Sequence, residues 1–276
     1  EGFPSETVSI GVPAERNGKD IVLIVNNFDR TSGTTLNGID SGVPHIKDIA
    51  YIGQMYQFRR SAEFITNDNP GFGASDSDYA GKTVAGNTFD YPYVHGKAVL
   101  KAGYPFYSCS NEAFCNDTTF RASAWSADLI CGKQVTTTVG SSREPKFQVF
   151  PRELQSALRA FTSAGGHVLV SGAHIATDVW EEIYPADVPK SYKTDTQKFV
   201  KDIFGYKHVT NYAGRKGYVA MVKSTRMGVE PAQAWTFYNQ INSECYSVET
   251  PDGITPVSSK TGSTFMRYTD TELSAG

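Results

Sequence analysis

The sequence predicts an α/β protein with a doubly wound, mainly parallel sheet. Two short apolar runs, at residues 21–25 (IVLIV) and 127–131 (ADLIC), have the composition of strands that are buried on both faces. Between and after them lie segments whose apolar residues recur at helical spacing. Strands that alternate with helices in this way predict right-handed crossovers and a parallel sheet.

Composition agrees with a folded, globular chain. The 276 residues include 39% hydrophobic and 20% charged residues, which suits one large domain or one domain with a small appendage. The formal charge is −3 and no basic block stands out, which argues against a general nucleic-acid-binding protein. No apolar run reaches the roughly 18 residues of a transmembrane helix.

The sequence predicts a boundary at residue 15. Residues 1–15 (EGFPSETVSIGVPAE) resemble the last strand and exit of a fibronectin type III module, so we expect a remnant of such a module or a linker there. Residues 16–276 are expected to form a single α/β domain. No terminal element is obvious at the end, where a doubly wound sheet would accommodate another strand and helix. We therefore expect the domain to be truncated there.

The first half of the chain contains the predicted central strand, at 21–25, and a long loop. Residues 44–58 carry apolar side chains at helical spacing and predict a helix. Residues 67–96 are rich in Gly, Asn, Asp and aromatic residues. A loop of this length is usually functional or disordered, and its aromatic residues favour an ordered one. A helix at about residues 94–102, ended by Gly103, and a strand at 106–109 are predicted next.

The clearest helix–strand unit comes in the second half. Its helix begins near Pro151, which suits the first turn, and ends at Gly165 and Gly166, which favour a left-handed cap. The predicted buried stripe of this helix consists of Leu154, Ala157, Leu158 and Phe161. Residues 168–170 predict a buried strand directly after it.

A second helix and several short strands complete the prediction. Thr194 and Gln197 form a capping box, which predicts that a helix begins there and ends at Gly205. Short strands follow, for example at residues 217–222, 244–248 and 264–268.

Polar residues follow the predicted strands at the edge where such sheets hold their ligands. This edge is expected to gather Asn26, Asp29, Arg30, Ser110, Glu112, Lys133, Ser171 and His174. Further binding residues are expected from the long loop and from the segment after the strand at 168–170. These are Asn87, Asp90, Tyr93 and Asp178.

Two nucleophile–base pairs are compatible with the pattern. Cys109 ends a strand, and His95 could generate its thiolate, an arrangement that loosely resembles caspase-like cysteine peptidases. Alternatively, Ser171 would be the nucleophile and His174 the base, although the flanking glycines of a G-x-S-x-G elbow are missing. The competing interpretations are a core cysteine and a small-residue turn that lets strand and helix pack closely.

Metal and cofactor signals are weak. The five histidines show no H-x-x-x-H or H-E-x-x-H spacing, and Pro70 and Gly71 interrupt any EF-hand pattern in the Asp/Asn-rich loop at 67–78. We expect neither a metal nor a cofactor. Cys109 and Cys115 either close a short disulfide loop or remain thiols.

The aromatic residues of the long loop have two possible roles. They would form a sugar-binding platform or anchor the loop to the core, or do both. These residues are Phe72, Tyr79, Phe89, Tyr91 and Tyr93.

Several longer stretches resemble a known family. The runs DNPGFGASDSDYAGKTVAGNTFDYPYVHGKA, YSCSNEA, DLICGKQ and AGGHVLVSGAHIATD look like the carboxyl-terminal α/β domain of large secreted Bacteroidetes proteins labelled xanthan lyase, golvesin-related or N-acetylmuramoyl-L-alanine amidase-like. The helix–Gly-Gly–strand pattern also resembles class I glutamine amidotransferase-like domains, a flavodoxin-like arrangement. The nucleophile of those enzymes would fall near Gly172 or Ala173, so glutaminase activity is not expected.

The resemblance implies a secreted, periplasmic or cell-surface protein that acts on glycan or peptidoglycan. We expect a hydrolase-like crevice carrying Cys109, His95, Glu112, Ser171 and His174, with a polysaccharide or peptidoglycan fragment and adjacent domains of a longer precursor as partners. The alternative is a noncatalytic module that binds glycan or supports a catalytic neighbour.

Overall fold

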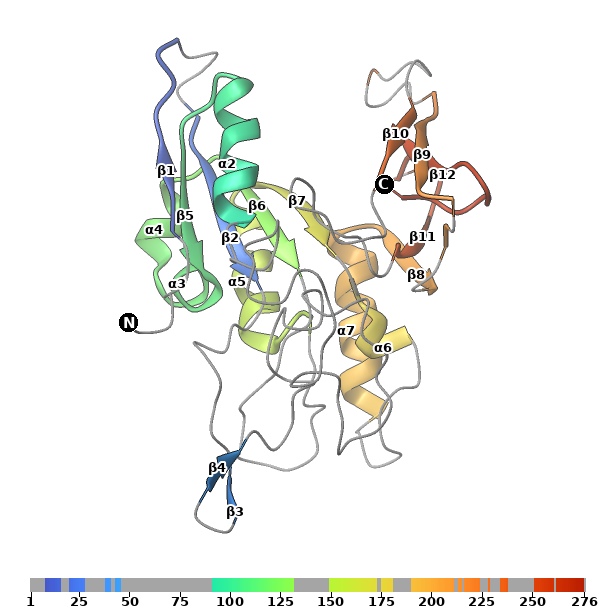
Figure 1. Ribbon diagram of the computed structural model, residues 1–276, viewed down its shortest axis with the longest axis horizontal. Helices are drawn as coiled ribbons and strands as arrows, with labels where there is room; N and C mark the ends of the chain where they lie inside the picture. Colours follow the sequence, from blue (N-terminus) through green and yellow to red (C-terminus); the bar gives the residue numbers. More distant parts are fainter. Residues whose placement is uncertain are drawn as a thin grey trace.

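A five-stranded sheet carries most of the core, and smaller antiparallel sheets lie beside it (Figure 1). The computed structural model describes residues 8–15, 20–27, 38–40, 43–45, 91–131, 149–172, 175–180, 190–210, 213–214, 216–223, 228, 234–237, 251–260 and 262–275. The strands are β1 (Ile10–Gly11), β2 (Val22–Asn27), β3 (Gly38–Asp40), β4 (Val43–His45), β5 (Phe106–Ser110), β6 (Ser126–Cys131), β7 (His167–Gly172), β8 (Tyr206–Thr210), β9 (Tyr218–Met221), β10 (Ala234–Thr236), β11 (Gly253–Pro256) and β12 (Met266–Tyr268). The helices are α2 (Tyr91–Lys101), α3 (Asn111–Asn116), α4 (Thr118–Ala122), α5 (Arg152–Ser163), α6 (Thr177–Trp180) and α7 (Lys190–Ile203).

The large sheet is mixed and mainly parallel, in the order β1-β5-β2-β6-β7. Strands β5, β2, β6 and β7 run parallel, and β1 pairs antiparallel with β5 at one edge. Leu23, Ile24 and Val25 of β2 are fully buried because the strand has neighbours on both sides and apolar layers on both faces. The predicted α/β class and central strand are confirmed.

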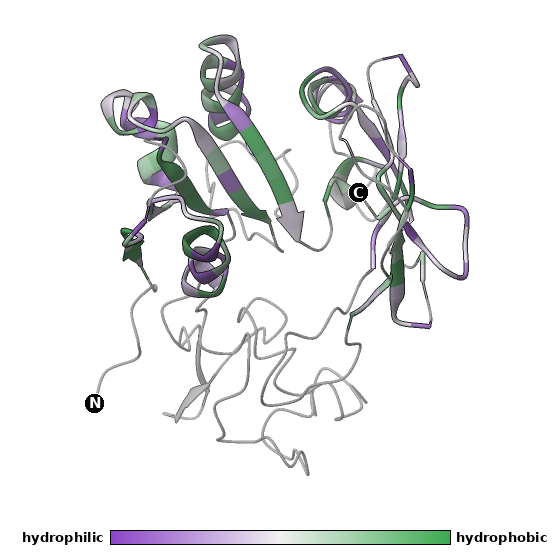
Figure 2. Cartoon of the chain, turned by 90° about the horizontal axis from the view of Figure 1, so that it is seen from above, coloured by the Kyte–Doolittle hydropathy of each residue, from purple (hydrophilic) through white to green (hydrophobic). Residues whose placement is uncertain are grey.

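Helices cover the sheet on both faces, but unequally. Seen from above, helices lie on both sides of the large sheet (Figure 2). Helix α2 lies over β5 and β2 on one face, where Ile24, Phe106 and Ile130 form a small apolar cluster with it. The larger cluster lies on the opposite face and draws its apolar side chains from α3, α4, α5 and α7. On the face that α2 covers, the described helices therefore pack on β5 and β2 and leave the other strands less covered.

Helix α5 shows how the sequence pattern produces packing. All four predicted stripe residues, Leu154, Ala157, Leu158 and Phe161, are buried, and Gly165 adopts a φ of 91° just after the helix. Near the start of this helix the Gln155 Nε2 donates to the Phe150 carbonyl at 2.7 Å and to the Thr196 hydroxyl of α7 at 3.1 Å.

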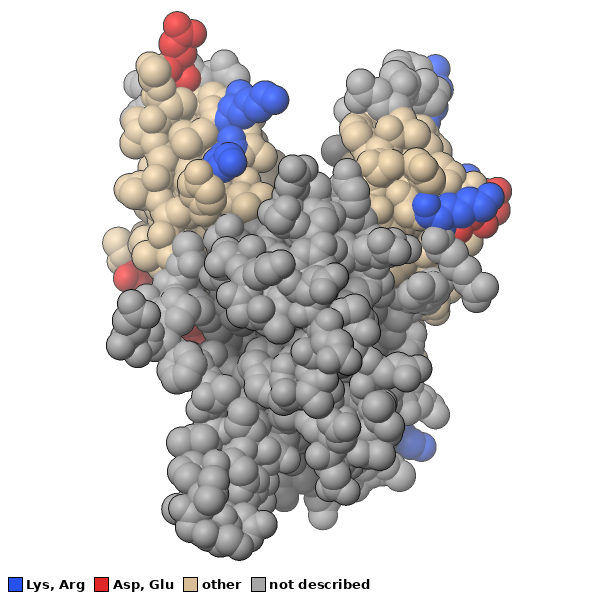
Figure 3. Space-filling view, viewed as in Figure 1, with Lys and Arg blue, Asp and Glu red and all other residues tan. Residues whose placement is uncertain are grey.

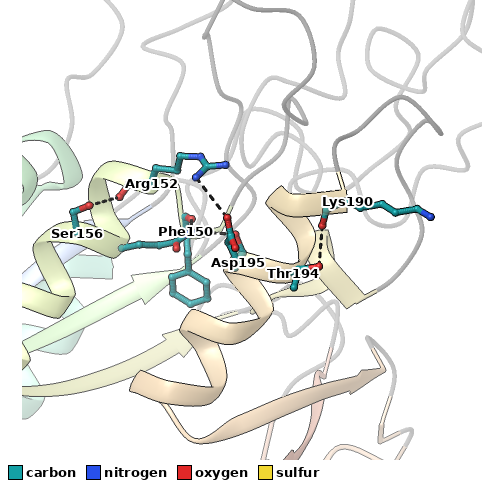
Figure 4. Close-up of polar contacts among 8 residues, drawn as sticks. Phe150, Arg152, Ser156, Lys190, Thr194 and Asp195 are labelled. Atoms are coloured by element: carbon teal, nitrogen blue, oxygen red, sulfur yellow. Dashed lines mark hydrogen bonds and ion pairs between the residues drawn. The ribbon is translucent and has the colours of Figure 1, made fainter.

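Helix α7 starts earlier than predicted, so the capping box is wrong. The helix already begins at Lys190, and the Thr194 hydroxyl donates to the Lys190 carbonyl at 2.9 Å within it (Figure 4). Such a back-bond to the preceding turn replaces the N-cap bond that the pattern suggested. Asp195 instead faces Arg152 of α5, with 3.9 Å between Oδ2 and Nη1.

Two further boundaries differ from the prediction. Helix α2 begins at Tyr91 rather than near Val94, so the end of the predicted long loop is helical. The sequence predicts a buried strand at β7, but β7 is an edge strand of the five-stranded sheet, and Leu169 is 59% exposed. Its VLV run packs one face only, through Val168 and Val170.

Some predicted elements lie outside the described residues. These are the loop at 67–90, most of the helix at 44–58 and the strand at 244–248. Val43–His45, at the start of that helix prediction, pairs with Gly38–Asp40 as a short hairpin.

The amino-terminal segment packs on the sheet. Gly11 of β1 is buried, and a Cβ there would lie 2.4 Å from the Phe106 ring, so this residue permits the close approach. The Ser108 amide also donates to the Ser9 carbonyl at 2.9 Å. Residues that the sequence assigns to a preceding module therefore form an edge of the large sheet.

The last third of the chain forms small antiparallel sheets. Strand β9 pairs with β10 and β12, β8 pairs with β11, and Ser274 bridges to both Ile254 and Arg267. In Figure 1 these strands form a second lobe beside β7, and α6 and α7 contact β8.

Candidate functional site

The strand order identifies where the large sheet reverses its winding. The parallel strands lie across the sheet in the order β5-β2-β6-β7, so β2, the first of them along the chain, has the second (β5) on one side and the third (β6) on the other. The connection through α2 lies on one face, and those through α3 to α5 lie on the opposite face. Ligands in such sheets bind near the carboxyl ends of the strands at this reversal, here around β2 and its neighbours.

A histidine–carboxylate pair lies on the α2 face beside β2, at the middle of β6 and three residues before its carboxyl end. The Nδ1 atom of His95, on α2, is 2.7 Å from Oδ2 of Asp128, on β6. A carboxylate only accepts hydrogen bonds, so Nδ1–H donates, and in the neutral form of the ring Nε2 carries the lone pair. The side chain of Asp128 is 7% exposed and that of His95 is 26% exposed, so the pair joins a buried acceptor to a solvent-accessible imidazole.

Strand register places other polar residues near the pair. Asn26 of β2, Ile130 of β6 and Ser171 of β7 occupy one row across the sheet. Asp128 lies two positions earlier along β6, beside Leu169. Because in-register residues of parallel strands share a face, Asn26 and Ser171 lie on the same face as Asp128, with strands about 4.8 Å apart.

Two buried oxygen atoms on this face have no hydrogen-bond partner among the described residues, namely Asp128 Oδ1 and Ser171 Oγ. A buried polar atom that is not satisfied costs free energy, and such atoms are concentrated at functional sites. Both are compatible with a polar ligand that enters from the α2 face.

The structure does not bring Cys109 and His95 together. Cys109 is 6% exposed and belongs to the core cluster of the opposite face, under α3 and α5. The sheet itself separates its sulfur from the imidazole, which corrects the expectation of a cysteine–histidine dyad. Cys109 and Cys115 are both thiols, with no disulfide between them.

A network of amides and thiols closes the end of β2 on that opposite face. Asn27 Nδ2 donates to the Val149 carbonyl at 3.0 Å, and Asn111 Nδ2 donates to Asn27 Oδ1 at 2.8 Å. The Cys115 thiol in turn donates to Asn111 Oδ1 at 3.1 Å. Burial raises the pKa of Cys115 to about 11, so this thiol is protonated at neutral pH and is a poor nucleophile.

The remaining predicted residues fall into two groups. Ser110 caps α3 by accepting from the Ala113 amide at 3.3 Å, Glu112 is exposed in the first turn of α3, and Tyr93 is 51% exposed on α2 beneath the Lys97 ammonium. Outside the described residues lie Asp29, Arg30, Asn87, Asp90, Lys133 and His174, and the side chain of Asp178.

Asp128 is the site residue that the sequence prediction omits. It stands inside the apolar run at 127–131, whose composition predicts a strand. A carboxylate in a strand buried on both faces must have a partner, since isolated buried charge is very costly. That requirement was the available signal, and the structure shows the partner to be His95.

Other features bear on the kinds of site that are present. In the described part of the chain, no group of three or more His, Cys, Asp or Glu side chains is arranged to hold a metal ion. None of the described helices combines the length and apolar character needed to cross a membrane.

The chain matches no family model, no curated protein and no solved structure.

Proposed function

We propose that this domain is a hydrolase in which His95 is the general base and Asp128 holds it in position. The observation that carries the proposal is the 2.7 Å contact between His95 Nδ1 and Asp128 Oδ2. A carboxylate bound to Nδ1 fixes the ring and its tautomer, and it stabilises the imidazolium that forms when Nε2 accepts a proton.

Water is the nucleophile that fits this geometry best. Among the described residues, no hydroxyl or thiol is hydrogen-bonded to the imidazole, whose contact is with Asp128. The partly exposed ring can take a proton from a water molecule that attacks an acyl carbon of a bound substrate, and it can return the proton to the oxygen or nitrogen that leaves. Ser171, one row away on the same face, is the neighbouring side chain that would bind a polar group of that substrate, whereas Asn26 in the same row is buried.

The proposed substrate is a glycan or a peptidoglycan fragment that lies outside the cytoplasm. This choice rests on the resemblance of the sequence to secreted α/β domains that are labelled as acting on such polymers. The finer fold proposed is a flavodoxin-like, class I glutamine amidotransferase-like arrangement. The order β5-β2-β6-β7 supports it, because it is the second-first-third-fourth order of that class.

The decisive test replaces His95 with asparagine. The Asn amide nitrogen lies near the position of Nδ1 and retains a donor for Asp128, but no base remains at Nε2. We expect His95→Asn to stay folded and to lose about 10²–10⁴-fold in kcat on the peptidoglycan fragment or polysaccharide that the wild-type chain turns over. Asp128→Asn should lower kcat as well.

A control variant distinguishes attack by water from attack by a cysteine thiol. Cys109→Ala should leave turnover unchanged, since the thiol faces the other side of the sheet. If the His95→Asn variant turns over the substrate as fast as the wild type, the pair only holds α2 on β6 and takes no part in the reaction.

The second candidate is a noncatalytic glycan-binding module, with the pair serving to hold α2 on the sheet. The burial of Cys109 in the core favours it, because one of the two predicted nucleophiles is thereby removed from the site. No turnover on a broad panel of peptidoglycan fragments and acidic or neutral polysaccharides, with retained binding, would support this candidate.

A further inference from the structure

Three aromatic rings form a row at the amino-terminal ends of the strands. The Tyr104 and Trp125 rings are nearly parallel, at 11°, with centroids 6.5 Å apart. The Trp125 and His167 rings have centroids 4.8 Å apart and are tilted by 51°. Trp125 is 45% exposed although it contacts both neighbours. We call these three residues the aromatic platform.

The platform continues toward the proposed site along β7. His167 and Leu169 are two residues apart and therefore lie on the same face of the strand. Leu169 is the register partner of Asp128, so this face is the one that carries the His95–Asp128 pair. The side chains of Trp125, His167, Leu169 and Asp128 thus follow one another along the sheet, and we call them the strip.

Helix α2 leaves this strip uncovered. It packs over β5 and β2, whereas β7 is the edge strand and Leu169 is 59% exposed. Figure 3 shows a notch in the molecular surface between two lobes, and Figure 1 places α2 in one lobe, β9, β10 and β12 in the other, and β7 between them. A chain-like ligand can therefore approach β7 from this side.

The chemistry of the strip selects its occupant. Its own exposed side chains are aromatic or aliphatic and include no Lys, Arg, Asp or Glu. Basic side chains lie beside the notch on the lobe that holds α2 (Figure 3), so it is the strip itself, and not the whole notch, that favours an uncharged ligand surface. In β-linked pyranoses whose hydroxyl groups are all equatorial, both ring faces consist of C–H groups. Such faces stack on flat aromatic rings, while the hydroxyl edges remain in water.

We infer that the aromatic platform and Leu169 bind a neutral, β-linked pyranose chain and lead it to the His95–Asp128 pair. This inference rests on the proposed function for the location of the reacting bond, and it narrows the substrate class to neutral β-glucan or N-acetylglucosamine polymers. The platform binds the chain, and the pair acts on an acyl substituent of it. His95 Nε2 takes a proton from water as the water adds to the carbonyl carbon, and it returns this proton to the oxygen or nitrogen that leaves when the acyl bond breaks.

The test compares two exposed tryptophans. Trp125→Ala is the test variant, and Trp235→Ala is its matched control, because Trp235 is 40% exposed on β10. Binding of an N-acetylglucosamine tetramer is measured by calorimetric titration, and retardation is measured in gels containing hydroxyethyl cellulose. We expect Trp125→Ala to weaken binding about tenfold and Trp235→Ala to leave it unchanged. Leu169→Asp, at an exposed position, should also weaken binding. It provides a second test if Trp125→Ala fails to fold.

The outcomes distinguish this inference from the proposed function. His95→Asn should bind the tetramer like the wild type, because it keeps the platform. Trp125-dependent binding without any turnover would support the inference and refute the hydrolase. Wild-type chain that fails to bind either probe, or equal binding by both tryptophan variants, would overturn the inference. A change in oligomeric mass on Trp125→Ala would instead identify the strip as an interface between copies, which also overturns it.

Discussion

Asp128 is the residue on which the candidate site depends. It is 5% exposed, in a strand whose neighbours Ala127 and Leu129 are fully or almost fully buried. A buried carboxylate in such a position is stable only with a hydrogen-bonded partner, and leaving one buried polar group without its partner costs about 1–3 kcal/mol. The contact with His95 therefore adds to the apolar packing that holds α2 on the sheet.

The thiol of Cys115 gives a prediction at the same scale. Burial raises its pKa to about 11, an effect that the Arg121 charge partly opposes. A solvated cysteine thiol has a pKa of 9.0 and is half ionised at that pH, whereas Cys115 should be only about one-hundredth ionised there. Iodoacetamide should therefore modify Cys115 slowly at pH 9 and much faster as the pH rises toward 11.

Peptide mapping by mass spectrometry measures this rate for Cys115 alone. The same peptide alkylated in urea is the control, since unfolding removes the desolvation and should restore the rate of a solvated thiol. Fast modification at pH 8 in the folded protein would show that Cys115 is an activated thiol rather than part of the Asn27–Asn111 network.

Helix α2 reaches the sheet through a glycine. A Cβ at Gly96 would lie 2.1 Å from the Phe106 ring, and Phe106 is only 3% exposed and cannot move aside. Gly96→Ala gains about 1 kcal/mol of helix propensity but costs about 1–3 kcal/mol in overpacking, so we expect a net loss of stability. The helix should shift outward, which would lengthen the adjacent His95–Asp128 contact.

Chemical denaturation measures the expected loss of stability, and turnover reports whether the longer His95–Asp128 contact lowers activity. Lys97→Ala is the matched control, because it lies next to Gly96 but is exposed and should change neither quantity strongly. A stabilised Gly96→Ala variant with normal activity would contradict the close approach of α2 to Phe106.

The elements also show what a sequence pattern can and cannot predict. The stripe of α5 was predictable because four apolar residues at helical spacing have one way to bury themselves. The edge position of β7 was not predictable, because a VLV run is compatible both with a strand covered on two faces and with a strand covered on one. The order of strands in a sheet depends on partners that are distant in sequence. The early start of α2 has a local reason: Pro92, in its first turn, has no N–H to satisfy.

The site was only partly predictable for the same reason. His95 was identified as a base from its type and place, but its partner lies on another element 33 positions away in sequence. Cys109 lies on the opposite face because alternation along β5 places it with Tyr107 rather than with Phe106, and only the packing of α2 shows which face holds the histidine.

The molecule as a whole has two lobes, which are joined by polar contacts at Asp252 and by the packing of Tyr206 and Ile254 against the large core cluster. Asp252, just before β11, accepts from the Ile175 amide at 2.7 Å through Oδ2, and Ile175 lies in the connection that follows β7. The Tyr268 hydroxyl donates to the Asp252 carbonyl at 2.8 Å, which extends this link to β12. Asp252 is 7% exposed, so its carboxylate acts where water competes little.

This link predicts how the two lobes unfold. Asp252→Ala removes the acceptor of the Ile175 amide and should cost about 1–3 kcal/mol, while Asp252→Asn keeps an acceptor oxygen and should cost less. Urea unfolding is followed by fluorescence in two single-tryptophan versions, one with Trp125 in the α/β lobe and one with Trp235 on β10. In Asp252→Ala we expect the Trp235 transition to move to lower urea than the Trp125 transition, because the small sheets lose their anchor to β7. Asp202→Ala, at an exposed position on α7, is the control and should shift neither. Coincident transitions in Asp252→Ala would show that apolar contacts of α6 and α7 with β8, rather than this carboxylate, couple the lobes.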